Sequence, residues 1–545
     1  MKSTFITISF LFTSILLFAT NYHVGPSQTY TTISAAPLEL LQAGDTLFIH
    51  YRATPYLDKF VIGASGSVSQ PVVIFGVANG NGDLPMINGN GAITRTQLDF
   101  WSETRGIIKI GGASTPSNNA SYIIVENLDI STARTGYFFD DDNGNNQEYA
   151  QNAAAIFIEK GDNITLRNIT MHDCGNGLFV ASQSSNVLVE YCYLYDNGIE
   201  SSIYEHNSYT ESDGITFQFN KYGKLRTNCL GNNLKDRSKG TVIRYNWIEG
   251  GNRQLDLVDS DDSSYYNDSK YNSTYVYNNV LVEMPGEGNR QIVHYGGDGG
   301  NENYYRKGTL YFYNNTVASY LPGNNTLFRL SSSGESIDAR NNLLYALATS
   351  GSFEISSDAK GVVDLQNNWI KSGWIASIAS NGGVVNDVSG NITGTAPGVV
   401  DLNGMDFNIA SGSPLINAAT SSLGVTATLE PKYELTTDST YASRLHFNDI
   451  GAYAYHSPVK VDKQVVNLSM TVFPNPTSGQ FNVLLPTSFK GAVLTVRNTL
   501  GQLILSKELD ESTIQSIVIE ANSGIYWVKI EANEKQLLTS KIIKY

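Results

Sequence analysis

The sequence is poor in cysteine and in charged residues, and both shortages restrict what the protein can be. The chain has three cysteines among 545 residues, Cys174, Cys192 and Cys229, and such a low and odd number argues against a disulfide scaffold. Charged residues make up 16% of the chain, and the formal net charge is −15. No run of basic residues occurs, so we expect no nucleic-acid partner, because binding to phosphates needs clustered lysine and arginine.

Long apolar runs are also missing, except at the N-terminus. Residues 1–20 combine Lys2, an apolar run over residues 5–18 and the small-residue pair Ala19-Thr20, which is the pattern of a secretory signal peptide. The run is too short for a membrane span, and no later segment is long and apolar enough for one. We therefore expect a secreted, soluble protein, and we expect it to be a monomer.

What the chain has in abundance is a recurring short motif. An apolar and a polar residue precede Asn-Asn or Tyr-Asn, and apolar residues follow. The copies contain Asn246, Asn279, Asn315, Asn342 and Asn368, which are 33, 36, 27 and 26 residues apart. Such strand-like repeats indicate stacked coils, because one strand cannot bury its apolar face alone. We predict that these asparagines hydrogen-bond from coil to coil and support left-handed turns.

Composition and turn signals divide the rest of the chain. Residues 21–456 form the repeat domain, and residues 457–470 form a polar linker. Residues 471–545 carry short alternating strands, for example over residues 493–496 and 526–530, separated by glycine turns. This pattern predicts a small β-sandwich.

The C-terminal unit closely resembles the type A sorting domain of the type IX secretion system of Bacteroidetes. The matching residues are Val472-Phe473-Pro474-Asn475-Pro476, Gly479, Leu500-Gly501-Gln502, Gly524-Ile525-Tyr526 and the basic end Lys541-Ile542-Ile543-Lys544-Tyr545. The resemblance implies that the type IX secretion machinery is a partner. It also implies export through the periplasm and the outer membrane, to the cell surface or the medium.

The repeat domain resembles the pectin-lyase-like right-handed parallel β-helix. The matching segments are the opening Tyr22-His23-Val24-Gly25 and Gly44-Asp45-Thr46-Leu47 and the closing Asp449-Ile450-Gly451-Ala452-Tyr453. We therefore predict an all-β protein, a right-handed parallel β-helix (solenoid) followed by a small C-terminal β-sandwich. The superfamily contains lyases, hydrolases, epimerases, esterases and non-catalytic adhesins, so the fold does not decide the activity.

One segment, residues 204–262, gathers most of the charged and imidazole groups of the central coils. The candidate catalytic residues are Lys235, Arg253, His206, Arg237 and, in the next coil, His294. The candidate substrate-binding residues are Arg290, Asn207, Tyr209 and Asn232. If the coils stack in register, Arg253 and Arg290 are neighbours and need a carboxylate beside them. That carboxylate is either an aspartate of the chain or part of a substrate. Alternatively, these residues form a structural ladder of ion pairs along the surface of the solenoid.

Lys235 lies in a motif with a chemical meaning. Residues 234–238 and the following Arg244-Tyr245-Asn246 resemble the motif of alginate lyases and chondroitinase B, which implies a catalytic role for Lys235. Such lyases neutralise the carboxylate of a uronic acid and remove the proton at C5. A lysine between arginines would be neutral enough to act as the base. The family's Arg-His pair falls on Val258 and Asp259, so Arg253, His206 or His294 would have to supply the second basic group. Alternatively, Lys235 is a solvated coil residue paired with an aspartate.

Acidic residues follow in the same region. The candidate metal ligands are Asp256, Asp259 and Asp261, and Asp140 and Asp142 in a separate acidic loop. Clustered carboxylates are suited to calcium, which makes calcium a possible cofactor. Two of the aspartates could instead be the acid and base of a glycosidase.

Together these features predict a secreted polysaccharide-degrading enzyme. We expect a lyase that cleaves a uronic-acid-containing polysaccharide by β-elimination, so that an acidic polysaccharide is the substrate. A β-helix glycoside hydrolase with paired aspartates and a non-catalytic carbohydrate-binding surface protein are the alternatives.

Overall fold

The computed structural model describes residues 19–286, 288–347, 352–357, 361–378, 383–420, 429–436, 440–457, 470–485, 488–499, 501–532 and 535–545. The chain divides into two compact units, Met1–His456 and Ser457–Tyr545. Most of the predicted signal peptide and of the predicted linker lies outside the described residues, as does Leu500 of the sorting motif.

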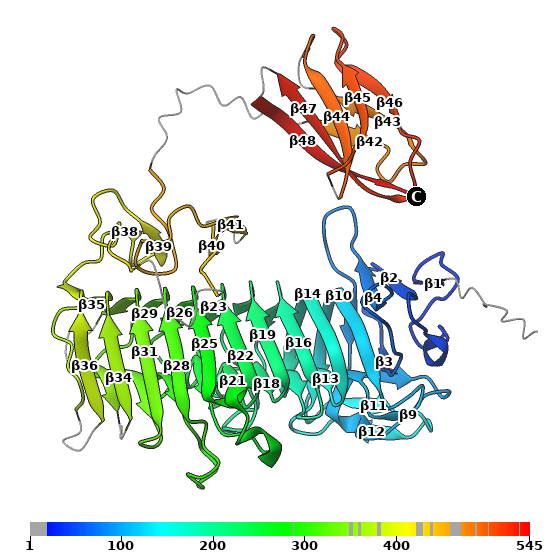
Figure 1. The fold of residues 1–545 in the computed structure, drawn as a ribbon. Helices are drawn as coiled ribbons and strands as arrows, with labels where there is room; N and C mark the ends of the chain where they lie inside the picture. The colour runs from blue at the N-terminus through cyan, green and yellow to red at the C-terminus, as the bar shows by residue number, and fades with distance from the viewer. Residues whose placement is uncertain are drawn as a thin grey trace, which may run out of the picture. The chain divides into compact units, whose positions relative to one another are not determined.

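The first unit is a right-handed parallel β-helix, as predicted, and a typical coil contains three short strands. One coil runs through β15 (Asn176–Val180), β16 (Ser185–Glu190) and β17 (Tyr193–Tyr195) to β18 (Ser208–Thr210). There β18 pairs with β15 in parallel and without a register shift. The strands of successive coils lie side by side in this way along the solenoid (Figure 1).

One face of the coil, called sheet 1, is a 13-stranded sheet. Its strands are, in order, β12 (Asn146–Glu148), β11 (Phe138–Asp140), β6 (Ala92–Thr94), β3 (Asp58–Ile62), β8 (Gly106–Ile110), β13 (Ala154–Ile158), β15, β18, β21 (Leu234–Asp236), β24 (Leu255–Leu257), β27 (Gln291–Tyr295), β30 (Asn325–Leu330) and β33 (Phe353–Ser357).

The other two faces form one 22-stranded sheet, because β10 (Ala120–Ala133) and β14 (Gly161–Cys174) are long enough to run through both. The remaining strands are β1 (Asn21–Val24), β2 (Thr46–His50), β4 (Val72–Val77), β5 (Met86–Asn88), β16, β17, β19 (Asp213–Gln218), β20 (Lys221–Tyr222), β22 (Lys239–Arg244), β23 (Trp247–Glu249), β25 (Ser273–Tyr277), β26 (Val280–Glu283), β28 (Gly308–Tyr313), β29 (Thr316–Ser319), β31 (Glu335–Arg340), β32 (Leu343–Ala346), β34 (Val362–Gln366), β35 (Trp369–Lys371), β36 (Val384–Ser389) and β37 (Ile392–Gly394).

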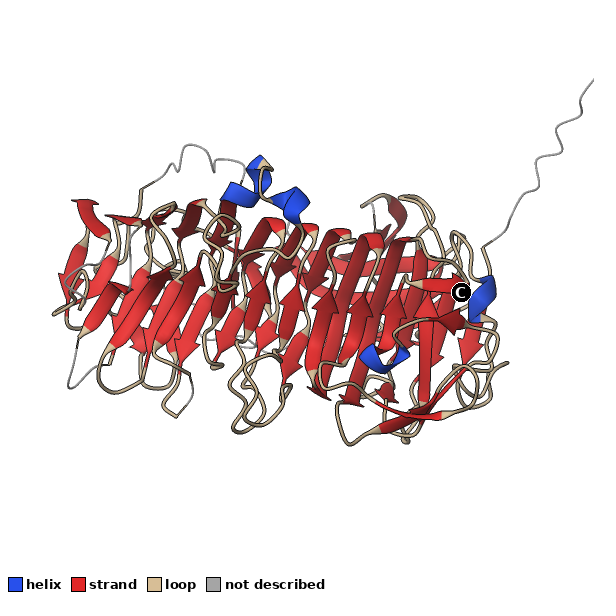
Figure 2. Ribbon diagram, turned by 90° about the horizontal axis from the view of Figure 1, so that it is seen from below, coloured by secondary structure: helices blue, strands red, loops and turns tan. Residues whose placement is uncertain are grey.

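Helical structure is confined to single turns on the loops (Figure 2). These turns are η1 (Leu38–Leu40), η2 (Glu103–Arg105), η3 (Ser263–Tyr265) and η4 (Ser269–Asn272), and a small hairpin consists of β7 (Asp99–Phe100) and β9 (Ala113–Thr115). Among the described residues, no helix is long and apolar enough to cross a membrane.

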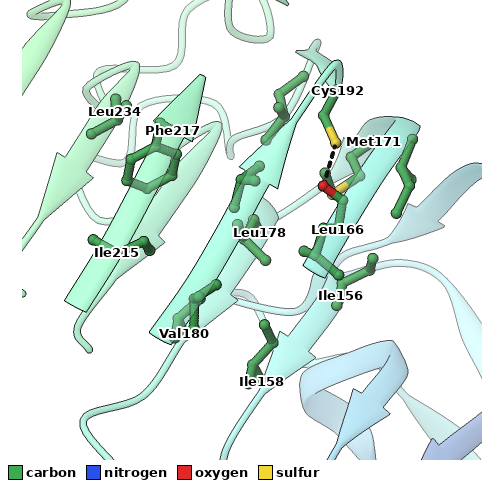
Figure 3. Close-up of a cluster of buried hydrophobic side chains, with 14 of the residues drawn as sticks. Ile156, Ile158, Leu166, Met171, Leu178, Val180, Cys192, Ile215, Phe217 and Leu234 are labelled. Atoms are coloured by element: carbon green, nitrogen blue, oxygen red, sulfur yellow. Dashed lines mark hydrogen bonds between the residues drawn. The ribbon is translucent and has the colours of Figure 1, made fainter. Parts of the chain in front are cut away.

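Inward-facing side chains form a continuous apolar core inside the coils (Figure 3). Ile156 and Leu178 are register partners in neighbouring coils, and Leu166, Phe217 and Leu234 are likewise fully buried. Burial of each such side chain contributes about 1.5–3 kcal/mol relative to exposure. Because residues of one strand alternate between inside and outside, the same strands project a second row of side chains outward.

The predicted asparagine ladder is confirmed. It consists of Asn220, Asn246, Asn279, Asn315, Asn342, Asn368 and Asn391. From Asn246 on, the side-chain oxygen of each accepts the main-chain N–H of the ladder residue in the preceding coil at 2.9–3.0 Å. The residue before each one supplies the left-handed turn, for example Tyr245 with φ 59° and Asn278 with φ 55°. The two roles predicted for asparagine therefore belong to adjacent residues of the motif.

The cysteines are free, and Cys174 and Cys192 are buried. Both are interior residues, but they do not stack on each other, although they lie in neighbouring repeats. Cys192 begins the asparagine ladder by donating its N–H to Asn220 at 2.9 Å, whereas Cys174 is the register partner of Ala133. The two cysteines occupy different corners of the coil.

After the last coil the chain returns along the outside of the solenoid. It forms two antiparallel hairpins, β38 (Val399–Asp401) with β39 (Asp406–Ile409), and β40 (Tyr433–Leu435) with β41 (Tyr441–Ser443). Phe407 and Ile450 pack against Trp369 and Val282 of the coils. This segment covers apolar positions that face outward from the β-helix.

The second unit is a small antiparallel β-sandwich, as predicted. Three strands, β42 (Thr471–Phe473), β43 (Gln480–Leu484) and β46 (Ile514–Val518), face four strands, β45 (Leu503–Glu508), β44 (Val493–Asn498), β47 (Gly524–Ala532) and β48 (Lys535–Lys544). Both sheets contribute to one apolar core, which includes Phe481, Val483, Leu494 and Val528.

Candidate active site

The outer face of sheet 1 carries a row of functional side chains, one from each coil. Phe179, Tyr209, Lys235, Asp256, His294 and Arg329 are register partners on β15, β18, β21, β24, β27 and β30. Parallel pairing without a register shift places these side chains above one another along the solenoid. Residues far apart in the sequence are thus brought into one site.

A cleft of about 720 Å³ lies over this row. Seven of the predicted site residues line it: His206, Tyr209, Asn232, Lys235, Arg237, Arg253 and Asp256. Concave sites with a few convergent polar groups are where ligands usually bind. The cleft is therefore the candidate active site.

Lys235 is buried and held by two carboxylates. Its Nζ donates to Asp256 Oδ2 at 2.9 Å and to the carboxylate of Asp298. Burial alone would lower the pKa of Lys235, but the two aspartates raise it above its ordinary value. The expectation of a neutral lysine is wrong, because the carboxylates outweigh both burial and the neighbouring arginine. Lys235 is an ammonium in this arrangement, not a solvated coil residue.

Arg237 lies beside Lys235 and shares one of its partners. Its Nη2 donates to Asp298 Oδ1 at 2.9 Å, and its Nε donates to the hydroxyl oxygen of Tyr209 at 2.9 Å. The Asp298 carboxylate thus bridges two cations, with one oxygen toward each. Burial raises the pKa of Tyr209, whereas Arg237 and Lys235 oppose this by favouring the phenolate.

Neither of the two candidate histidines is placed to accept a proton from a substrate. Burial, and then Lys235, lowers the pKa of His206 to about 3, so its ring is neutral at neutral pH. His206 Nδ1 accepts the main-chain N–H of Asn232 at 2.8 Å, which places the ring proton on Nε2. His206 can therefore donate a hydrogen bond in the cleft, but it has no free nitrogen with which to accept a proton.

His294 is the buried member of the row on β27, and it has no free nitrogen either. Its Nδ1 lies 2.7 Å from Asp256 Oδ1, and its Nε2 lies 2.7 Å from Ser331 Oγ. Despite its burial, the pKa of Asp256 is held well below the ordinary value by Lys235 and His294, so Asp256 is a fixed anion. It also accepts from Asn232 Nδ2 at 2.8 Å. Within the row, Asp256 and His294 therefore hold Lys235 in place.

Two of the predicted substrate-binding residues lie elsewhere. Asn207 is fully buried inside the coil, where it donates to Gly223 O and Asn233 Oδ1. Arg290 is exposed and donates to main-chain carbonyls at Pro322 and Asn324, away from the cleft residues. A buried amide that satisfies main-chain groups has a structural role, and neither residue reaches the cleft.

The expected pairing of Arg253 with Arg290 is wrong. Leu255 pairs with Val293, and the same offset places Arg253 beside Gln291. Arg253 accordingly donates through Nε and Nη2 to Gln291 Oε1, and its Nη1 lies 3.6 Å from Asp256. The length of the intervening loop shifts the register by one residue, which no local motif reveals.

The predicted metal ligands do not converge on one point. Asp259 and Asp261 lie 3.7 and 3.8 Å from Arg237 Nη1. Asp140 accepts from Asn146 Nδ2, and Asp142 accepts from Asn143 Nδ2, both within the β11–β12 hairpin. Over the described part of the chain, no group of three or more His, Cys, Asp or Glu side chains is placed to hold a metal ion. Calcium binding stays a prediction.

A melting experiment tests that prediction. If calcium binds at the acidic hairpin or beside Arg237, a chelator should lower the melting temperature, and added calcium should restore it by mass action. Magnesium at the same concentration is the control for ionic strength. Superimposable melting curves with chelator and with calcium would remove both sites.

Asp298 is the site residue that the sequence analysis missed. It lies on the loop between β27 and β28, in the run Gly296-Gly297-Asp298-Gly299-Gly300. A carboxylate flanked by glycines on both sides was a usable signal, since such loops approach other backbones and ligands closely. Its main-chain N–H donates to Asp259 Oδ1 at 2.7 Å, which fixes the loop over the cleft.

The C-terminal unit can be assigned by comparison. Residues 471–545 match the family model described as "Secretion system C-terminal sorting domain". The C-terminal unit is a sorting domain. The protein is therefore exported and is either secreted or displayed at the cell surface, in agreement with the predicted type IX pathway. No curated protein sequence shows significant similarity to the chain.

Solved structures similar to this chain include enzymes with several activities. An alginate lyase from Paenibacillus sp. str. FPU-7 is 13% identical, with a TM-score of 0.32 over 64% of this chain and 93% of that one. The pectate lyase Pel9A is 12% identical, with a TM-score of 0.40 over 81% and 98%. A GH136 lacto-N-biosidase from Eubacterium ramulus is 14% identical, with a TM-score of 0.37 over 69% and 68%. At these scores none of the three supports the transfer of an activity.

The sorting domain leads to a prediction about export. Deleting residues 471–545 should leave the β-helix folded and retain the protein in the periplasm, because the two units have separate cores. Immunoblots of periplasm, outer membrane and medium measure the distribution, and an unchanged melting transition of the β-helix is the control. Normal amounts of truncated protein in the medium would contradict the sorting role.

Proposed function

We propose that the protein is an exported enzyme that cleaves an acidic polysaccharide by β-elimination in the cleft of sheet 1. The observation that carries the proposal is the carboxylate of Asp298, which lies between Lys235 and Arg237 with one oxygen toward each. Two cations that hold one carboxylate in this way form a site for the carboxylate of a uronic acid. In the proposal, the substrate displaces Asp298.

The two cations would supply the chemistry that elimination requires first. Removing the C5 proton of a uronic acid places negative charge next to its carboxylate, and this charge must be stabilised. Lys235 and Arg237 are both buried to more than nine-tenths, so water screens their charges only weakly. Both are protonated despite burial. Asp256 and Asp298 raise the pKa of Lys235, and Tyr209, followed by nearby aspartates, raises the pKa of Arg237.

Tyr209 is the best-placed base. Its hydroxyl oxygen already accepts a hydrogen bond from Arg237 Nε, and the ammonium of Lys235 lies 5.8 Å from the centre of its ring. Burial holds the pKa of Tyr209 above its ordinary value, but both contacts oppose this shift and favour the phenolate, which would take the proton from C5. The electron pair of that bond forms the C4=C5 double bond as the O4 sugar leaves. The phenol can then return the proton to the leaving oxygen.

This assignment gives Lys235 a different role from the one that its motif implies. An ammonium held by two carboxylates cannot accept a proton, so Lys235 would bind the substrate carboxylate instead. His206 would position the sugar by donating from Nε2. The proposal keeps the lyase reaction but moves the base by one coil, from β21 to β18.

A hydrolase is the second candidate, because Asp256 and Asp298 contact the same ammonium. Their carboxylates are therefore close, as the acid and nucleophile of a retaining glycosidase are. However, Asp256 is 1% exposed, and its pKa is well below the ordinary value, so it is poorly suited to donating a proton or reaching a sugar. This weakens the hydrolase alternative.

The proposal is tested on a panel of polysaccharides. Polygalacturonate, alginate and a glycosaminoglycan are incubated with the protein, and neutral polymers serve as controls. We expect the ultraviolet absorbance of new 4,5-unsaturated ends with at least one uronate polymer and with no neutral one. New reducing ends without that absorbance would favour the hydrolase, and no cleavage of any polymer would favour a binding protein.

Asp298 leads to a prediction of its own. Replacing Asp298 by asparagine should lower KM for the uronate polymer several-fold, because an uncharged amide competes less for Lys235 and Arg237. Asp261→Asn is the matched control, since Asp261 also lies near Arg237 but is exposed. A KM that is unchanged or higher in Asp298→Asn would show that the Asp298 carboxylate does not compete with the substrate.

A further inference from the structure

A second cavity, of about 570 Å³, lies outside β17, β20 and β23. Residues 404–408, together with Leu435, Thr436 and Tyr441, form its other wall. It shares no lining residue with the cleft of sheet 1. Because β17, β20 and β23 belong to a different face of the coil, the cavity is a separate site.

Aromatic rings from successive coils form the floor of this cavity. Tyr193, Lys221 and Trp247 are register partners on neighbouring strands. Beside them, Tyr191 and Phe219 stack with ring centroids 4.9 Å apart and an interplanar angle of 18°. Tyr191 is 46% exposed, so its ring is available to a ligand and is not only a packing residue.

The row of rings continues beyond the cavity along β17 and from there to the preceding coil. Tyr193 stacks on Tyr195 at 4.4 Å, and Tyr195 stacks on His172 at 5.0 Å. Together these rings form an aromatic strip on which the faces of sugar rings can pack.

Lys221 provides a charge that is not neutralised. It is exposed, and its Nζ lies 5.1 Å from the centre of the Tyr193 ring. Among the described residues, no carboxylate pairs with its ammonium. Asp406, the acidic residue of the opposite wall, accepts instead from the main-chain N–H and Nδ2 of Asn408, at 3.1 and 2.7 Å. The cavity thus offers an anion a cation that lies beside aromatic faces.

We propose that this cavity and its row of rings bind a segment of an acidic polysaccharide without cleaving it. Faces of pyranose rings present C–H groups that pack on aromatic rings, and a uronate carboxylate would reach Lys221. The binding itself does not depend on the proposed lyase activity. If the cleft of sheet 1 acts on the same polymer, binding in the cavity also raises the local concentration of substrate.

Binding of oligogalacturonate and oligoalginate is measured by calorimetry in Arg237→Ala protein, in which the cleft is disabled. Tyr193→Ala and Lys221→Glu are added singly, and Lys490→Glu, at an exposed lysine of the sorting domain, is the matched control. We expect one oligouronate to bind to Arg237→Ala protein. Either Tyr193→Ala or Lys221→Glu should reduce its affinity about tenfold or more, which is equivalent to about 1.4 kcal/mol. The control should bind like Arg237→Ala.

Each other outcome overturns the proposal. If Arg237→Ala protein binds no oligouronate, or binds it equally well with and without the two cavity substitutions, the cavity is not an oligouronate site. Equal binding of a neutral oligosaccharide would overturn the role of Lys221. If the cavity binds no oligouronate but the parent protein still cleaves a uronate polymer, this inference is overturned and the proposed function stands.

Discussion

Replacing Tyr209 by phenylalanine is expected to lower kcat on the uronate substrate by about 100-fold or more, the usual scale for loss of a general base. The phenyl ring keeps the packing against Phe179, whose ring centroid lies 5.2 Å away, so stability should barely change. The parent enzyme should become faster as pH rises in the alkaline range, because more Tyr209 is then phenolate. This rise should be absent in Tyr209→Phe, as measured by initial rates of unsaturated-product formation.

Variants of Lys235 separate the two possible bases. As a bound cation, Lys235 should be partly replaceable by arginine, whereas Lys235→Ala should lose most of kcat/KM. Tyr204→Phe is the matched control, since Tyr204 lines the same cleft but is 71% exposed. Full activity of Tyr209→Phe together with an inactive Lys235→Arg would return the role of base to Lys235.

Replacing Arg306 by alanine is expected to lower the free energy of unfolding by about 3–5 kcal/mol, the cost of breaking a buried ion pair. Arg306 enters the coil from the loop that carries Asp298, and it is fully buried. Its guanidinium lies 3.4 Å from the buried carboxylate of Asp236 and donates to Thr274 Oγ1 at 3.1 Å. Without Arg306, the charge of Asp236 is left buried without its cation.

Urea denaturation followed by tryptophan fluorescence measures this effect. Lys270→Ala is the control, because Lys270 pairs with Asp213 at the surface and should contribute at most about 1 kcal/mol. The double variant Arg306→Met, Asp236→Leu should recover much of the lost stability, since removing both charges avoids an unpaired one. A small effect of Arg306→Ala alone on the free energy of unfolding would contradict the stabilising role of its buried ion pair with Asp236.

The coil architecture could be predicted because it depends on a local repeat. Each copy of the Asn-Asn motif specifies its own left-handed residue and its own ladder amide, as at Asn278 and Asn279. Stacking the copies then requires no knowledge of the loops between them. The β-sandwich was accessible for the same reason, through alternating strands and glycine turns.

The site could be predicted only in part, because it depends on loop lengths and on burial. Tyr209 and Lys235 share a row because their strands pair at adjacent coils, and both lie in the segment that the sequence singled out. Asp298 reaches them from a loop, so the raised pKa of Lys235 was not foreseeable from its neighbours in sequence. Likewise, one residue of register separates the actual Gln291 partner of Arg253 from the expected Arg290.

The mass of the products tests the central claim most directly. β-Elimination only divides the polymer, so the masses of the two fragments from each cleavage should add up to the mass of the starting oligouronate. Hydrolysis adds one water to every broken bond. Mass spectrometry of a defined oligouronate after incubation should therefore show fragments with no added water, one of them unsaturated. Fragments whose masses sum to the substrate plus one water would contradict the proposed elimination.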